Sequence, residues 1–128
     1  MRKNKYGVAP KEQRTSRDGI VFASKAELNR WEKLRLWQLA GDIRNLRRQV
    51  KYPLTIDGVL VGHYTPDFVY EKRPMSPGSI HTVEATLPDL WTEVIEDVKG
   101  AMTTDAALRI KVFEVIHKKK VHIVRGSK

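Results

Sequence analysis

The chain has 128 residues, a length typical of one domain with a single hydrophobic core of modest size. Its 24 lysines and arginines outnumber its 15 aspartates and glutamates, and the net charge of +9 indicates a polyanionic partner, most simply a nucleic acid. The absence of cysteine excludes disulfides, thiolate metal sites and cysteine nucleophiles. No apolar run approaches the roughly 20 residues that span a bilayer, and residues 1–6 lack the apolar stretch of a signal peptide. We therefore expect a cytoplasmic protein with no membrane partner.

The N-terminal part of the chain predicts a basic arm followed by a helix. Residues 1–17 are polar and basic, and we expect them to form a flexible arm ahead of one domain at residues 18–128. Ser24 begins the first clear helix, because Glu27 three residues later completes a Ser-x-x-Glu capping box. Apolar residues then recur at near-helical spacing, and Gly41 is placed to end the helix.

The middle of the chain predicts strands. Residues 43–56 alternate unevenly between apolar and basic side chains, which indicates a strand, and Asp57-Gly58 is a strong hairpin signal. The chain would return through a second strand-like run at residues 62–70. Three prolines and a glycine within residues 73–89 predict a surface loop, with a short strand near residues 80–83.

The C-terminal part predicts a strand, a helix and a last strand. Residues 91–98 resume the sheet, Gly100 ends that strand, and Thr103 or Thr104 would cap the second helix. An apolar stripe on this helix, widened by Ile110 and Phe113, consists of Leu108, Val112, Val115 and Ile116. Lys118 to Lys120 would close the helix before a strand at residues 121–124. Helix, three or four strands, helix and strand in this order predict an α/β domain with a mixed central sheet flanked by helices.

The run Asp97-Val98-Lys99 carries the chemistry. Alternate side chains of a strand face the same way, so Asp97 and Lys99 would project together while Val98 points to the core. Asp67 lies in the neighbouring strand-like run, and two carboxylates with a lysine suit a divalent metal and an activated water, as in phosphodiester cleavage. Glu96 has the opposite parity, which excludes it from that site. The simpler alternatives are that Asp67 is a turn residue and that Asp97 is a solvated acid paired with Lys99.

With these elements in order, the chain resembles the PD-(D/E)xK nuclease superfamily, and more narrowly the small phage-encoded nucleases grouped with Holliday junction resolvases. The family pattern is a glutamate on the first helix, an aspartate on the second core strand and an acid-x-lysine on the third. Glu27, Asp67 and the pair Asp97 and Lys99 match it, and the resemblance covers residues 17–117. It implies a restriction-endonuclease-like core, and a host-cell cytoplasm as the location if the protein is phage-encoded.

The resemblance also implies Mg²⁺, for which Mn²⁺ would substitute. Asp67 and Asp97 would be direct oxygen ligands, the Val98 carbonyl a third, and Glu27 would complete the site directly or through water. Lys99 would position the attacking water or stabilise developing charge. Two residues each have two possible roles. Glu27 is either a metal ligand or only the acid of the capping box. Gln49 either orients the water or the phosphate, or is a polar residue of an edge strand.

Three basic clusters predict contacts with DNA phosphates, although each is equally a solvated face. Their candidate DNA-binding residues are Arg14, Arg17, Arg47, Arg48, Lys51, Lys118, Lys119 and Lys120. Phosphate contacts carry little sequence information, so a structure-selective endonuclease is expected. The resemblance implies branched DNA as substrate and a two-fold homodimer, with Trp31, Trp37 or residues 87–91 as interface candidates. A duplex or single-strand nuclease of the same fold, and a non-catalytic nucleic-acid-binding protein, remain as alternatives.

Overall fold

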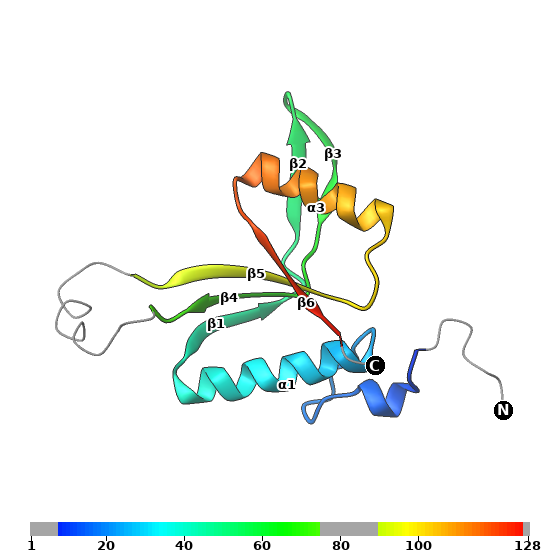
Figure 1. Ribbon diagram of the computed structural model, residues 1–128, viewed down its shortest axis with the longest axis vertical. Helices are drawn as coiled ribbons and strands as arrows, with labels where there is room; N and C mark the ends of the chain where they lie inside the picture. The colour runs from blue at the N-terminus through cyan, green and yellow to red at the C-terminus, as the bar shows by residue number, and fades with distance from the viewer. Residues whose placement is uncertain (1–7, 75–89, 127–128) are drawn as a thin grey trace.

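The computed structural model describes residues 8–74 and 90–126. Its elements in chain order (Figure 1) are a 3-10 helix η1 (Lys11–Arg14), helix α1 (Lys25–Ala40), strands β1 (Ile43–Arg48), β2 (Tyr52–Ile56), β3 (Val59–Tyr64), β4 (Phe68–Lys72) and β5 (Thr92–Lys99), helix α3 (Thr104–His117) and strand β6 (Val121–Arg125). The predicted α/β class is confirmed. The predicted short strand at residues 80–83 lies outside the described residues, and no helix within them is long and apolar enough to cross a membrane.

A four-stranded sheet forms the centre, with strand order β1-β4-β5-β6. The first three strands of that order pair antiparallel, whereas β6 is parallel to β5, so the sheet is mixed as predicted. Helix α3 makes the crossover that a parallel pair requires. Strands β2 and β3 form a separate hairpin, in which Asp57 and Gly58 take the positive φ angles of a tight hairpin turn, 50° and 78°.

Two predicted strands are each interrupted. The run 43–56 divides into β1 and β2, which belong to different sheets, because Gln49 between them has a left-handed φ of 54°. The run 62–70 divides at residues 65–67, where Pro66 has no N–H to donate to a strand partner. Five strands therefore precede α3 within the described residues, where the sequence predicted three or four.

Helix α1 has the predicted boundaries because both caps form. The Ser24 hydroxyl accepts a hydrogen bond from the Glu27 N–H at 3.1 Å. At the other end Gly41 has a φ of 85° and donates to the Gln38 carbonyl at 3.1 Å.

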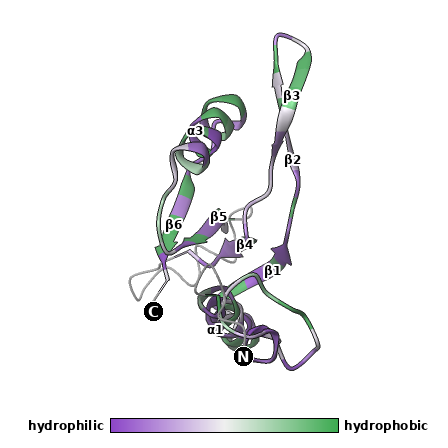
Figure 2. Cartoon of the chain, turned by 90° about the vertical axis from the view of Figure 1, so that its right-hand side faces the viewer, coloured by the Kyte–Doolittle hydropathy of each residue, from purple (hydrophilic) through white to green (hydrophobic). Residues whose placement is uncertain are grey.

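Helices cover both faces of the sheet, and Figures 1 and 2 show α1 on one side with α3 and the hairpin on the other. The core beneath α1 consists of Phe22, Trp31, Leu34, Ile43, Phe68 and Tyr70. The core beneath α3 consists of Leu54, Tyr64, Val69, Ile95, Ile110, Phe113 and Val121. Because Trp31 is buried in the first core, it is not available as the dimer interface considered from the sequence.

The predicted stripe on α3 is wrong at two positions. Ile110 and Phe113 face the core, whereas the side chains of Leu108 and Val115 are 64% and 75% exposed. The apolar pattern on this helix is wider than the face that the sheet and hairpin cover. Periodicity alone therefore assigned Leu108 and Val115 to the buried face of the helix, although both are exposed.

Candidate active site

Strand β5 presents alternate side chains to opposite faces of the sheet, as predicted. Asp97 and Lys99 lie on the α3 side, with the Lys99 Nζ 3.7 Å from the Asp97 Oδ2. Val98 points the other way and packs against the core beneath α1.

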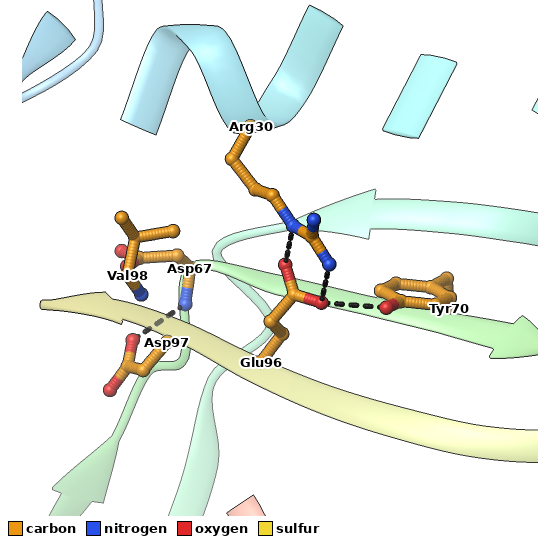
Figure 3. A network of polar contacts seen from close by, with 6 residues as sticks. All are labelled: Arg30, Asp67, Tyr70, Glu96, Asp97 and Val98. Atoms are coloured by element: carbon orange, nitrogen blue, oxygen red, sulfur yellow. Dashed lines mark hydrogen bonds and ion pairs between the residues drawn. The ribbon is translucent and has the colours of Figure 1, made fainter. Parts of the chain in front are cut away.

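Asp67 lies immediately before β4, rather than within a strand as predicted, and is adjacent to Asp97. Phe68 pairs with Glu96, and this register brings the end of the preceding turn beside the last residues of β5. The Asp67 N–H donates to the Asp97 Oδ1 at 3.1 Å (Figure 3), and the Val98 N–H donates to the Asp67 Oδ2 at 2.8 Å. Through these two bonds, each carboxylate is fixed by a backbone N–H from a part of the chain that is distant in sequence.

The electrostatics of this pair are those of crowded, partly desolvated acids. The pKa of Asp67 is raised to about 8: burial is the largest cause, the negative charges of Glu27 and Asp97 act in the same direction, and the hydrogen bond from the Val98 N–H acts in the opposite direction. A carboxylate pair in this state gains stability from a nearby cation.

Tyr64, which the sequence did not single out, fixes the second acid. Its hydroxyl donates to the Asp97 Oδ2 at 2.6 Å, and burial together with this bond raises the pKa of Tyr64 well above its usual value. The phenol therefore stays protonated and remains a donor. The sequence indicated this residue only through its position at the end of the predicted hairpin strand.

Glu27 lies in the first turn of α1 and is 7% exposed. Its backbone N–H takes part in the Ser24 cap, as the capping-box interpretation requires. Its carboxylate charge also contributes to the raised pKa of Asp67, which places that charge near the acid pair. The described residues show the Ser24 half of the capping box but no hydrogen bond from the Ser24 N–H to the Glu27 carboxylate, so the role of this carboxylate as a cap stays a prediction.

The oxygen donors of this site fit a hard divalent cation such as Mg²⁺. Asp67 and Asp97 supply adjacent carboxylates, and burial with the nearby negative charges raises the pKa of Asp67. Within residues 8–74 and 90–126, no three acidic or histidine side chains are arranged to hold a metal together.

A pocket of about 370 Å³ opens over the acid pair on the α3 side. Asp67, Asp97 and Lys99 form one part of its wall, while His63 from β3 and Arg109 from α3 form another. Gln49 is not among the residues that line this pocket; it is exposed, in the connection between β1 and β2.

Several candidate DNA-binding residues are engaged within the protein. Arg14 donates to the carbonyls of Ala9 and Phe22, at 2.7 Å and 2.6 Å, so the N-terminal arm has defined contacts in its residues 8–17. Residues 1–7 of the arm lie outside the described chain. The Arg48 guanidinium lies 4.6 Å from the centre of the Phe22 ring.

The other candidates lie nearer the surface. Arg47 donates to the Asn45 carbonyl at 3.3 Å, and Lys119 pairs with Glu93 at 2.6 Å. Lys120 lies 3.9 Å from Glu114 while its side chain is 85% exposed. Three further candidates are exposed: Arg17, Lys51 and Lys118.

Glu96 has a structural role on the opposite face (Figure 3). It is fully buried, its two oxygens accept from Arg30 at 2.6 Å and 2.9 Å, and Tyr70 donates to it at 2.6 Å. This network ties α1 to the sheet and keeps Glu96 away from the acid pair, as its parity predicted.

Comparison of the chain with protein-family models, with curated proteins and with solved structures finds no match.

Proposed function

We propose that this protein is a Mg²⁺-dependent DNA endonuclease with a PD-(D/E)xK site and a restriction-endonuclease-like core, and that branched DNA is its substrate. The observation that carries the proposal is the adjacency of Asp67 and Asp97, with the Lys99 amine 3.7 Å from the second acid. A buried acid pair costs stability, so its presence beside a lysine in an open pocket favours a functional role over a structural one.

The residues divide the work as follows. Asp67 and Asp97 would hold the cation, with the Val98 carbonyl and Glu27 as further donors. When bound, Mg²⁺ lowers the pKa of a water ligand and neutralises charge on the phosphate. Tyr64 keeps Asp97 in place, and the Lys99 ammonium orients the water or stabilises the charge that develops on the phosphate oxygens.

DNA is the substrate that the charge distribution supports. The chain carries a net charge of +9, although its site is acidic. Exposed Arg17, Lys51 and Lys118 are available for phosphate contacts, which give affinity without sequence selectivity. Resolution of a junction takes two symmetric cuts, so the proposal includes a two-fold homodimer.

The experiment is cleavage of matched labelled DNAs by the pure protein with Mg²⁺, Mn²⁺ or EDTA. The substrates are a four-way junction, a flap, a linear duplex and a single strand. Symmetric metal-dependent cuts confined to the junction are expected. Metal-dependent cutting of every substrate would support the nuclease activity and contradict the preference for junctions.

A second candidate is a nucleic-acid-binding protein without turnover. The observation that favours it is that no three acidic or histidine side chains of the described residues are arranged as a metal site. Tight DNA binding with no cleavage under any metal would select this candidate.

A further inference from the structure

A second hollow adjoins the acidic pocket, with aliphatic side chains on two of its walls and polar side chains where it meets that pocket. It has a volume of about 280 Å³, close to the lower end of ligand pockets, which measure about 300–1,000 Å³. Aliphatic side chains from the hairpin and from α3 face each other across it: Leu54, Val61, Leu108 and Val112. Three polar residues line both this hollow and the acidic pocket, so the two share a wall: His63, Asp105 and Arg109.

Two of the four aliphatic side chains of this hollow, those of Val61 and Leu108, lie outside the core. Val61 is 58% exposed and Leu108 is 64% exposed, and the part of β3 nearest the hairpin tip is coloured as hydrophobic in Figure 2. Exposed aliphatic side chains gathered from two separate elements, beside a polar site, are typical of a binding surface.

Arg109 stands between the two hollows. Its Nη1 donates to the His63 carbonyl at 3.4 Å, which uses one of the five N–H donors of a guanidinium. The side chain is exposed, so an anion in the acidic pocket can reach the remaining donors.

We propose that the apolar hollow binds one unpaired nucleobase adjacent to the phosphate that is cut, and that Arg109 contacts the intervening phosphate. The inference rests on the proposed nuclease function and deepens it. A nucleotide joins an apolar base to an anionic phosphate, and the two hollows offer matching surfaces on either side of Arg109. Bases of a continuous duplex are stacked and must be flipped out to enter such a site, whereas unpaired bases enter without that cost. The site therefore favours a branch point at which the base next to the cut is unpaired or leaves its stack at low cost.

Two kinds of variant test the hollow without disturbing the fold. The double substitution Val61→Ser with Leu108→Ser removes apolar contact from two exposed positions. Gly62→Leu fills the hollow from β3, because a Cβ at Gly62 would meet no atom within 4 Å. Val115→Ser is the matched control, since Val115 is 75% exposed on the same helix but does not line the hollow.

The probes are a fluorescein-labelled single strand and a four-way junction, each also prepared with one abasic site placed at successive positions. Binding is measured by anisotropy with Ca²⁺ in place of Mg²⁺, and cleavage with Mg²⁺. We expect one abasic position, next to the cut, to weaken binding to the wild type about 10-fold, in the range of one stacked base. Both hollow variants should bind the intact probe about as weakly as the wild type binds the abasic probe. Their affinity should not fall further when the abasic site is introduced. The Val115→Ser control should behave as wild type.

The outcomes separate this inference from the nuclease proposal. If the wild type cleaves DNA and the hollow variants bind and cleave as it does, the base site is wrong and the nuclease stands. If no protein cleaves but binding still depends on the abasic position and on the hollow, the base site stands and the nuclease is wrong. If the wild type binds neither probe, both are wrong.

Discussion

The backbone N–H of Asp67 donates a 3.1 Å hydrogen bond to the Oδ1 of Asp97, so the carboxylate of the second acid is held by the backbone of the first. The Val98 N–H completes the link with a 2.8 Å bond to the Asp67 carboxylate. A turn before β4 and the end of β5 are thereby joined where two carboxylates and the Lys99 amine come together.

Tyr64→Phe should slow cleavage while leaving DNA binding intact. The change removes only the hydroxyl that donates to the Asp97 Oδ2 at 2.6 Å. A hydrogen bond to a charged group contributes about 1.5–3 kcal/mol, so the cleavage rate is expected to fall about 10-fold as Asp97 loses its position. Single-turnover kinetics and DNA binding in Ca²⁺ measure the two effects separately. Tyr52→Phe is the control, because it makes the same chemical change at the residue paired with Tyr64 in the hairpin, and it should cleave at the wild-type rate. An equal fall in the cleavage rate of both variants would contradict the role of Tyr64 in positioning Asp97.

Arg30→Ala should destabilise the fold strongly. It leaves the fully buried Glu96 carboxylate without its cation, and breaking a buried pair in this way costs about 3–5 kcal/mol of unfolding free energy. The double variant Arg30→Met with Glu96→Leu should regain most of that loss, because apolar side chains then replace both charges. Urea denaturation measures all three proteins. A loss for Arg30→Ala below about 1 kcal/mol, the value of an exposed pair, would contradict the structural role.

Glu27→Gln distinguishes a metal-site acid from a helix cap. Glutamine can serve at this capping position, so the unfolding free energy should change by less than about 0.5 kcal/mol. The Mg²⁺ concentration for half-maximal cleavage should rise about 10-fold, the usual effect of losing an outer ligand. Ser24→Ala is the converse control, with a stability loss of about 1 kcal/mol and an unchanged Mg²⁺ requirement. An unchanged Mg²⁺ requirement in Glu27→Gln would leave Glu27 as a capping residue alone.

Gly126→Ala should destabilise the junction between β6 and α1. A Cβ at this position would lie 2.8 Å from the Cβ of Ala26, in the first turn of the helix that carries Glu27. Overpacking of this kind costs about 1–3 kcal/mol, which thermal or urea unfolding resolves. Gly100→Ala is the control, since a Cβ there would meet no atom within 4 Å, and it should unfold as the wild type does.

The sequence predicted the parts of the fold that local rules determine. The Ser24 and Gly41 caps fixed α1, Asp57-Gly58 fixed the hairpin, and strand alternation placed Asp97 and Lys99 together. It did not predict the break at Gln49, because a glutamine in the left-handed region has no local signal. It also did not predict that Leu108 and Val115 would be exposed, since the covered face of α3 depends on where the hairpin packs.

The candidate site was predictable only in its acids and lysine. Tyr64 and Arg109 reach it from β3 and α3, and their contribution depends on the tertiary packing of elements that the sequence does not order in space. The buried pairing of Arg30 with Glu96 is of the same kind. Its partners lie 66 residues apart, and only the parity of Glu96 indicated the face on which it would be found.

The most direct measurement compares wild type with Asp97→Asn for cleavage of a labelled four-way junction in Mg²⁺, with binding to the same junction followed in parallel. Asparagine removes a negative charge beside the phosphate and keeps the side-chain shape. We expect metal-dependent cleavage by the wild type. In Asp97→Asn the cleavage rate should fall by about 1,000-fold, because a central electrostatic contact is lost. Binding of the variant to the junction should be retained or become tighter. Persistent cleavage by Asp97→Asn would contradict the assignment of this acid pair as the active site.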